Sequence, residues 1–211
     1  MAREGIPFVA AGLLLAAACW YARQWTPVLA PGSAVFGLAA VFMAFFFRDP
    51  RRQAPGLPGA VVSAADGRVV SVEQLAHDDY LDGPATRISV FLSVFNVHVN
   101  RVPHEGEVDF VDRRSGSYRV AYAERASEEN EQSVIGIRCG GHRLVVKQIV
   151  GILARRIACR LVPGQQVRRG ERFGLIRFGS RVDLILPESA RIEVSVGDRV
   201  RGGETVMGVL A

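Results

Sequence analysis

Two long uncharged runs open the chain. Residues 6–22 and residues 27–47 contain no Asp, Glu, Lys or Arg, and a polar break at Arg23 and Gln24 separates them. A membrane-spanning helix needs about 20 apolar residues, with a lower limit near 17. We therefore predict a membrane helical hairpin. A secretory signal peptide fits less well because a second, longer run follows at once, and the remaining alternative is a buried helical hairpin in a soluble core.

The pattern changes after a Pro- and Gly-rich linker at residues 53–59. Short β-branched runs now alternate with Gly, Asp and Pro, which is typical of strands and turns. Residues 152–161 are ambiguous between helix and strand, and the polar, acidic residues 123–132 predict a solvated loop or short helix. The fold class is therefore mainly β (α+β), with a membrane anchor and basic juxtamembrane segment at residues 1–52 and a β-rich domain at residues 53–211. The predicted strands are 61–62, 68–72, 86–92, 106–111, 134–138, 144–150, 173–178 and 182–186.

An internal repeat lies near the end of the chain. The pattern G-x-x-V-x-x-G-E occurs at residues 164–171 and again at residues 197–204. Two such turn–strand units related by a pseudo-twofold axis would build a small sandwich like that of lipoyl- and biotin-carrier domains. A carrier domain displays a lysine on the hairpin between its halves, but no lysine lies between these copies. Gly179 and Ser180 lie there instead, and we predict that they form the tip of a hairpin.

The Gly179–Ser180 dipeptide has a chemical interpretation as well as a structural one. The Ser180 hydroxyl can attack the carbonyl of Gly179, which has no side chain to obstruct the approach. The attack gives an ester, and elimination from that ester leaves a pyruvoyl group on the new N-terminus. A short motif of this kind is weak evidence when it stands alone.

The charge of the chain suggests an anionic partner. The formal net charge is +5, and Lys147 is the single lysine among 26 basic residues. Arginine binds phosphate through a planar fork, so anionic lipid and nucleic acid both qualify. The β-rich part is poor in aromatic residues that would stack bases, which argues against nucleic acid. Arg3 before the first run and Arg48, Arg51 and Arg52 after the second place both ends, and the domain that follows, on the cytoplasmic side of the cell membrane.

The cysteines and most of the histidines carry no metal-binding pattern. The cysteines have no C-x-x-C spacing, so we expect free thiols in a reducing compartment. Three histidines lack the spacing of metal ligands, and we expect no metal site. The cysteines are Cys19, Cys139 and Cys159, and the three histidines are His77, His104 and His142.

Four stretches resemble a known family. They are residues 47–51 (FRDPR), residues 64–67 (AADG), residues 91–103 (FLSVFNVHVNRVP), and residues 148–151 (QIVG) with 154–157 (ARRI), which lead to the FGS of residues 178–180. In these stretches, which follow one another in the expected order over nearly the whole chain, the sequence resembles the phosphatidylserine decarboxylase proenzymes, in their short bacterial class.

The resemblance implies a self-processing enzyme of phospholipid synthesis. It implies cleavage into a β chain, residues 1–179, and an α chain, residues 180–211, which stay together as a heterodimer that can form homo-oligomers. A covalent pyruvoyl group would replace Ser180, with no metal and no nucleic acid involved. Through a Schiff base, this group would decarboxylate phosphatidylserine in the membrane to phosphatidylethanolamine. The alternatives are decarboxylation of an ether-linked lipid serine and a non-catalytic membrane adaptor with a carrier-like β-sandwich.

The resemblance also suggests site residues, with one departure. Larger relatives have two histidines three apart, whereas this chain has His98 and then Arg101, and an arginine cannot act as a base. We expect His98 to do acid/base work, protonating the carbanion, and Arg101 to bind the substrate carboxylate or phosphate. Asp66 assists cleavage or is an Asp-Gly turn residue. His98 has the alternative of a core histidine, and Arg155 and Arg156 hold the phosphate or form a solvated face. The base that activates the serine stays open.

Overall fold

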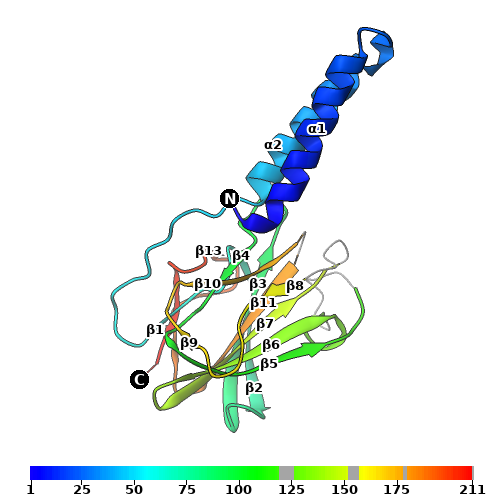
Figure 1. Ribbon diagram of the computed structural model, residues 1–211. Coiled ribbons are helices and arrows are strands. Elements are labelled where there is room, and N and C mark those ends of the chain that lie inside the picture. The colour runs from blue at the N-terminus through cyan, green and yellow to red at the C-terminus, as the bar shows by residue number, and fades with distance from the viewer. Residues whose placement is uncertain (119–125, 152–156, 178–179, 211) are drawn as a thin grey trace. The chain divides into compact units, whose positions relative to one another are not determined.

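The computed structural model describes residues 1–118, 126–151, 157–177 and 180–210 (Figure 1). The chain divides into two compact units, Met1–Pro50 and Arg51–Ala211. The first unit is helical and the second consists mostly of strands. The predicted fold class, mainly β with a helical N-terminus, is therefore confirmed.

The first unit is a pair of helices joined by a short turn. Its two helical segments, Arg3–Ala22 and Pro27–Phe46, each have 20 residues and are apolar enough to cross a membrane by length and composition. Large side chains such as Leu14 and Leu38 are exposed, whereas a hairpin in a soluble core would bury one apolar face. The core-hairpin alternative is therefore wrong. The elements are η1 (Arg3–Gly5), α1 (Ile6–Ala22), η2 (Pro27–Leu29) and α2 (Ala30–Phe46).

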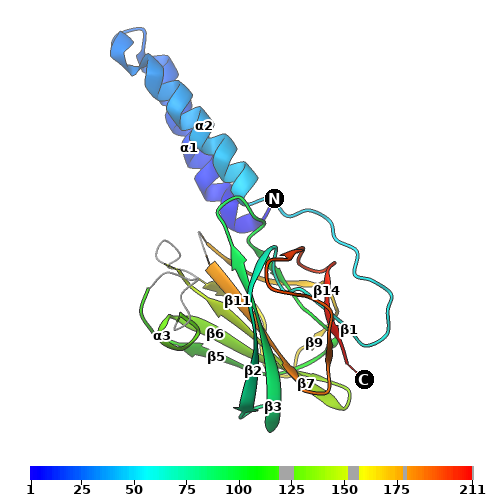
Figure 2. The ribbon, with the colours of Figure 1, turned by 180° about the vertical axis from the view of Figure 1, so that it is seen from behind.

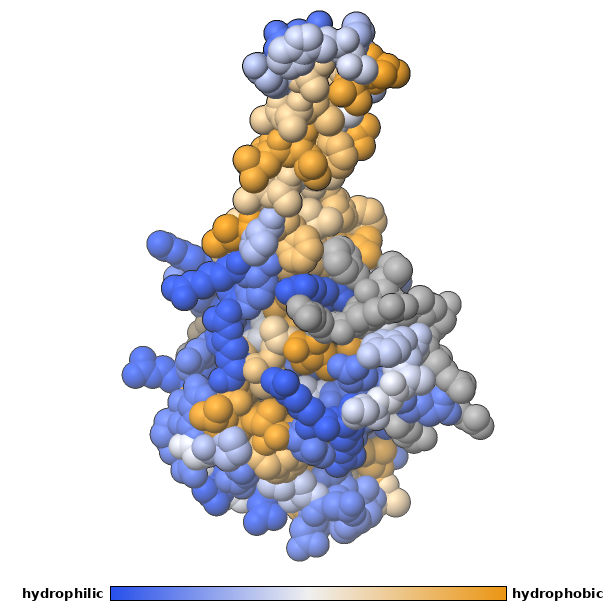
Figure 3. Space-filling model, turned by 45° about the vertical axis from the view of Figure 1, so that its right-hand side comes forward, coloured by the Kyte–Doolittle hydropathy of each residue, from blue (hydrophilic) through white to orange (hydrophobic). Residues whose placement is uncertain are grey.

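The surface of this helical pair is apolar along its length and polar at its turn (Figure 3). At the turn, the guanidinium carbon of Arg23 lies 3.2 Å from the ring centroid of Trp20. Tyr21 packs edge-on against Trp25, with ring centroids 4.9 Å apart. Aromatic rings of this kind are typical of the membrane–water interface. The distribution is the one expected of a helical hairpin in a bilayer.

The second unit is built from one curled eight-stranded sheet and two three-stranded sheets (Figures 1 and 2). Every strand predicted from the sequence has a counterpart. A short helix, α3 (Ala126–Glu129), lies in the predicted loop or short helix, and part of the ambiguous stretch is strand β8, while residues 152–156 lie outside the described residues. The strands are β1 (Ala60–Val62), β2 (Gly67–Asp78), β3 (Gly83–Leu92), β4 (Val99–Arg101), β5 (Gly106–Arg114), β6 (Gln132–Cys139), β7 (His142–Ile149), β8 (Ile157–Cys159), β9 (Gln166–Val167), β10 (Arg172–Ile176), β11 (Ser180–Pro187), β12 (Arg191–Ile192), β13 (Arg199–Val200) and β14 (Val206–Val209).

The two halves of the strand order have the same arrangement, related by a rotation about the centre of the large sheet. The large sheet has the order β13-β2-β3-β11-β7-β6-β5-β9, and the small sheets have the orders β1-β14-β12 and β4-β10-β8. The strands β1–β3 and β11–β14 therefore match β4–β10, strand for strand, about a pseudo-twofold axis between β11 and β7. We call the first set the split half, because it comes from two stretches of chain, and the second set the continuous half.

Backbone contacts repeat between the halves. The motif glycine Gly197 donates its N–H to the carbonyl of Val69 at 2.9 Å, and Gly164 donates to the carbonyl of Val108 at 2.7 Å. The four glycines that define the motif, Gly164, Gly170, Gly197 and Gly203, have positive φ angles between 78° and 100°, a region that favours glycine. The predicted pseudo-twofold repeat therefore exists, but it relates the two whole halves of the unit. Its motif copies contain β9 and β13, at opposite edges of the large sheet, and do not form a small carrier-like sandwich with each other.

The predicted hairpin at Gly179 and Ser180 is wrong. β10 pairs with β4 and β8, whereas β11 pairs with β3 and β7. The two strands on either side of the dipeptide therefore do not pair with each other, and the chain passes here from the continuous half back into the split half. In the continuous half, Cys139 of β6 pairs with His142 of β7 across a tight hairpin. In the split half the corresponding pair is Leu92 and Ser180, and the whole continuous half is inserted between them.

Candidate active site

Ser180 is the first residue of β11 and is fully buried. Successive side chains of a strand point to opposite faces, so Ser180 shares a face with Val182 and Leu184, which belong to the main hydrophobic core. Its Oγ has no hydrogen-bond partner among the described residues. An unsatisfied buried hydroxyl is costly, and its presence here marks a chemically available group. Gly179 lies outside the described residues.

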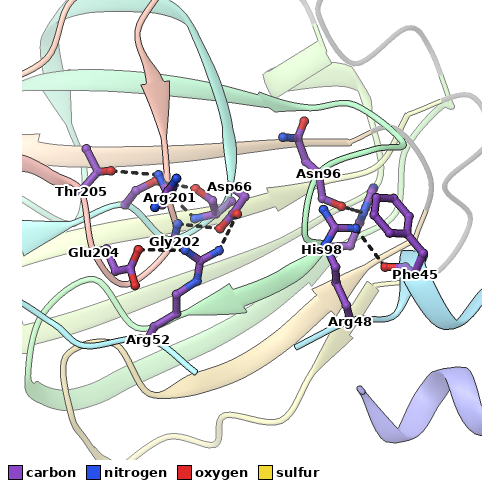
Figure 4. Close-up of polar contacts among 12 residues, drawn as sticks. Phe45, Arg48, Arg52, Asp66, Asn96, His98, Arg201, Gly202, Glu204 and Thr205 are labelled. Atoms are coloured by element: carbon purple, nitrogen blue, oxygen red, sulfur yellow. Dashed lines mark hydrogen bonds and ion pairs between the residues drawn. The ribbon is translucent and has the colours of Figure 1, made fainter. Parts of the chain in front are cut away.

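His98 is brought to the same end of the sheet by the chain that follows β3. The residue is fully buried, and its carbonyl accepts a hydrogen bond from the N–H of Ile176, at 3.2 Å. Its Nδ1 lies 3.0 Å from the carbonyl oxygen of Asn96 (Figure 4). Because a carbonyl only accepts, Nδ1 donates, and Nε2 is the ring nitrogen that exchanges a proton when the charge of the ring changes. The geometry suits a histidine that takes and returns a proton at Nε2.

A short turn fixes the carbonyl that holds His98. The Oδ1 of Asn96 accepts hydrogen bonds from the backbone N–H of Ser93 at 2.9 Å and from its hydroxyl at 2.7 Å. The N–H of Asn96 donates in return to the carbonyl of Ser93 at 3.0 Å. Side-chain-to-backbone bonds of this kind set turn geometry. The tautomer of His98 is therefore fixed by the local chain.

Two fully buried amides lie on the interior side of this end. Gln148 of β7 donates from Nε2 to the Oδ1 of Asn100 on β4, at 2.8 Å. Gln148 lies between the core residues Val146 and Val150 on the inward face, and it is opposite Val182 of β11. Its Oε1 has no hydrogen-bond partner among the described residues. The site therefore holds a second unsatisfied buried oxygen besides that of Ser180.

Asp66 precedes β2, at the same end of the sheet, and both its oxygens are engaged. Oδ2 forms an ion pair with Arg52 at 2.7 Å, and Oδ1 accepts the backbone N–H of Gly202 at 2.8 Å. Arg52 also pairs with Glu204 at 2.8 Å. In Figure 4 these residues form one group, and His98 with Asn96 forms another. These contacts join the segment before β2 to Arg52 and to the backbone of the second motif copy, and the assisting role of Asp66 in cleavage stays a prediction.

Of the arginines proposed for substrate binding, the structure describes the position of one. Arg101 donates from Nη1 to the carbonyl of Gly170 at 3.1 Å, and a Cβ at Gly203 would lie 2.8 Å from its Cδ. It is therefore packed between the two repeat motifs at the end of β4. Arg155 and Arg156 lie outside the described residues.

The outward face of β11 carries a buried ion pair directly after Ser180. Arg181 and Asp183 are 2% and 0% exposed, and Nε of the first lies 2.6 Å from Oδ1 of the second. Ser89 of β3 accepts a hydrogen bond from Arg181, and Ser127 of α3 donates to Asp183 at 2.6 Å. Lys147 lies opposite Asp183 in the sheet. Burial lowers the pKa of Lys147, and the Asp183 carboxylate partly offsets this effect.

Ser180 and His98 are predicted from the sequence, whereas the two buried amides at this end of the sheet are not. Asn100 and Gln148 both lie inside stretches that carry the family resemblance. A signal was present, because each is a polar residue at an inward position of an apolar strand. Within the described parts of the chain, no group of three His, Cys, Asp or Glu side chains could hold a metal ion.

Comparisons with known proteins identify the family of this chain. Residues 39–208 match the family model described as phosphatidylserine decarboxylase. A phosphatidylserine decarboxylase proenzyme of Desulfotalea psychrophila is 43% identical, with 99% of this chain and 95% of the relative covered. The proenzyme of Geobacter sulfurreducens is 44% identical, with 100% and 96% covered, and that of Syntrophus aciditrophicus is 41% identical, with 99% and 96% covered. The family-model match over residues 39–208 and the full-length similarity to these relatives show that this chain belongs to the phosphatidylserine decarboxylase family.

Proposed function

We propose that the chain cleaves itself between Gly179 and Ser180 and then decarboxylates phosphatidylserine to phosphatidylethanolamine at a membrane surface. The observation that carries the proposal is the Ser180 hydroxyl, which is fully buried and has no hydrogen-bond partner among the described residues. A member of this family uses such a serine as the source of its prosthetic group. A fully buried hydroxyl at the start of β11 fits that role.

The cleavage needs one nucleophile and no external reagent except water. The Oγ of Ser180 attacks the carbonyl carbon of Gly179, the C–N bond between the residues breaks, and the hydroxyl proton passes to the departing nitrogen. Loss of the Cα proton of residue 180 then breaks its Cβ–O bond and releases Gly179 as a carboxylate. Water converts the remaining enamine to a ketone and releases ammonia. The result is a pyruvoyl group at the start of β11.

The residues around Ser180 would serve the lipid reaction. The pyruvoyl group supplies a carbonyl that condenses with the substrate amine and accepts the electron pair left by carbon dioxide. His98 would deliver a proton from Nε2 to the carbon that loses carbon dioxide, because its Nδ1 is committed to the carbonyl of Asn96. Arg101 would bind the carboxylate or phosphate of the substrate. Asp66 would assist by holding the turn at this end of the sheet rather than by moving a proton.

The two products of cleavage would remain one folded unit. The α chain, residues 180–211, would contain β11–β14, and β11 lies between β3 and β7 in the large sheet. Val182, Leu184 and Leu186 are buried in the main core. Burying one such side chain is worth about 1.5–3 kcal/mol, and the sheet hydrogen bonds add to this. A heterodimer of residues 1–179 and 180–211 follows.

The helical first unit would anchor the enzyme. Its two segments have the length and composition of membrane spans, and Arg48, Arg51 and Arg52 follow the second segment directly. The positive-inside tendency places such arginines in the cytoplasm. The catalytic unit would therefore work on the cytoplasmic side of the cell membrane, where its lipid substrate is present in the same bilayer.

Intact mass spectrometry of the purified protein tests the proposal. We expect two chains, the smaller beginning at residue 180 with a blocked N-terminus, together with release of carbon dioxide from phosphatidylserine vesicles. The Ser180→Ala protein should stay in one piece and release none. A wild-type protein that is active as a single full-length chain would contradict the proposal.

A further inference from the structure

The pseudo-twofold axis allows each residue of the candidate active site to be compared with the residue at the matching position of the other half. Leu184 of β11 lies opposite Val146 of β7, at the centre of the symmetric strand pair. By this register Gln148 of the continuous half matches Leu186 of the split half. Two matching positions of the same fold therefore hold an amide, Gln148, at the Ser180 end and an apolar side chain, Leu186, at the other end.

The partner of Gln148 differs in the same way. Asn100 of β4 lies opposite Gly174 of β10, and Val61 of β1 lies opposite Gly208 of β14. The hydrogen-bonded pair of Asn100 and Gln148 at the Ser180 end thus corresponds to Val61 and Leu186 at the other end, which are both core residues. Because the apolar pair fills the same place in the fold, the fold itself does not require the amides.

A glycine keeps room for the amide pair. A Cβ at Gly174 would lie 2.8 Å from the Nε2 of Gln148 and 2.3 Å from the carbonyl oxygen of Ala158. Asn100 is held in turn, with its Nδ2 3.5 Å from the carbonyl oxygen of Ala64. The Gln148 amide is therefore fixed at its nitrogen end, and its oxygen faces the other way.

We propose that Gln148, oriented by Asn100, is a positioning residue that accepts a hydrogen bond from the amino group of the serine headgroup. Its Oε1 is a fully buried acceptor without a hydrogen-bond partner among the described residues, and it shares the inward face with Ser180. A buried acceptor left unsatisfied is costly in a protein that has no ligand for it. A primary amine is a donor that must approach residue 180 in the proposed reaction. This inference rests on the proposed function.

Cleavage itself does not need this contact. Gln148 carries an amide, which neither gives nor takes a proton at neutral pH and cannot activate Ser180 as a base. Neither oxygen has a hydrogen-bond partner in the described parts of the chain, so Gln148 and Ser180 do not bond to each other. The role of Gln148 should therefore appear in recognition of the amine and not in processing.

The test measures binding to an uncut protein, so that turnover plays no part. Full-length Ser180→Ala in detergent is titrated with two soluble headgroups, glycerophosphoserine and its analogue without the amino group. We expect the amine-bearing probe to bind about tenfold or more tightly, the ratio that a hydrogen bond to a charged group provides. Adding Gln148→Leu and Asn100→Val, which copies the pair of Leu186 and Val61, should remove that preference and leave the protein folded.

Two further proteins sharpen the result. Gln148→Glu keeps an oxygen acceptor and should retain the preference for the amine. Gln132→Leu makes the same change to a buried glutamine on the neighbouring strand β6 and should also retain it. In an otherwise wild-type chain, the double variant Gln148→Leu/Asn100→Val should still be cut into two chains on intact mass spectrometry.

The outcomes separate this inference from the proposed function. An unchanged preference for the amine in the double variant overturns the inference. Failure of the double variant to be cut, while wild type is cut, also overturns it, because Gln148 would then act on Ser180. A wild-type chain that is never cut contradicts the proposed function. The binding comparison in the Ser180→Ala protein still decides the inference in that case.

Discussion

The two ends of the curled sheet share a backbone and differ in chemistry. At one end lie Ser180, Gln148 and Asn100, all fully buried and all polar. At the other end the matching residues on the neighbouring strands include Leu186 and Val61, and both belong to the hydrophobic core. Burial of polar groups destabilises the folded state, whereas burial of apolar groups stabilises it. The apolar end shows what the scaffold needs for stability, and the polar residues that depart from it are candidates for function.

The outward face of the central strands repeats this lesson. Arg181 and Asp183 form a buried ion pair in the split half, whereas the matching residues of the continuous half are Arg143 and Val145. Arg143 is exposed and lies over Tyr80, with its guanidinium carbon 5.5 Å from the ring centroid. A buried ion pair is weak evidence of stabilisation, because desolvation offsets the attraction. Its presence only beside the proposed cleavage point, within the matched strands β11 and β7, suggests that it fixes the start of β11.

Ser180→Ala should produce the largest difference between the ends. Without the hydroxyl, no nucleophile reaches the carbonyl of Gly179, so neither cleavage nor decarboxylation can occur. Intact mass spectrometry should show one full-length chain, and carbon dioxide release from phosphatidylserine vesicles should fall to background. His142, which pairs with Cys139 as Ser180 pairs with Leu92, is the matching residue at the other end. The His142→Ala protein should be cut and active. Loss of cleavage in His142→Ala would break the comparison.

His98→Ala should rank second. The position that matches His98 at the other end is Gly59, beside β1, which carries no side chain. Removing a general acid typically slows a reaction by about 10²–10⁴-fold. We expect a loss of that size in the rate constant of lipid decarboxylation by the cut enzyme. His77→Ala, which changes an exposed histidine on β2, is the control and should keep the wild-type rate. Normal turnover of His98→Ala would exclude His98 from the mechanism.

The sequence predicts where the strands lie along the chain well, but it predicts which strands pair with each other poorly. Strands such as β3 and β7 follow from alternating and β-branched patterns, which are local. Whether β10 pairs with β11 depends on residues far away in the chain, and the short turn signal at Gly179 and Ser180 indicated a hairpin that does not exist. The wrong hairpin did not affect the chemical prediction, because attack of Ser180 on Gly179 depends on adjacent residues.

The repeat was visible only where backbone geometry constrains the sequence. The motif copies keep their glycines because Gly164 and Gly197 adopt positive φ angles. Elsewhere the halves match in register but not in residue type, as Gln148 and Leu186 show. The functional amides were missed for the same reason, since one sequence does not reveal which inward polar position matches an apolar one.

Asp183→Asn tests whether the buried pair beside Ser180 matters more than an exposed pair of the same spacing. The change leaves Arg181 buried without its counter-charge, so we expect a loss of about 3–5 kcal/mol in the free energy of unfolding. The control is Asp112→Asn on β5, which removes an Arg114 pair in which both side chains are at least half exposed. Exposed pairs are worth about 0–1 kcal/mol. Urea unfolding of both variants in the Ser180→Ala background measures the difference, and equal losses would contradict the special role of the buried pair.

Glu73→Gln should have the smallest effect on stability, and the size of the effect should depend on pH. Glu73 and Asp112 occupy matching positions on β2 and β5, and Glu73 pairs with Arg87 of β3. Burial raises the pKa of Glu73, but the hydrogen bond from Arg87 and the charge of that guanidinium outweigh it and hold the pKa below its ordinary value. A carboxyl group with a lowered folded-state pKa stabilises the protein above its unfolded-state pKa, and this stabilisation is lost as the pH falls through the folded-state value. Glu73→Gln should therefore lower stability slightly at pH 7 and flatten its decline below about pH 4.5, measured as melting temperature against pH. A decline as steep as in the unchanged protein would mean that Glu73 contributes nothing to the difference between the halves.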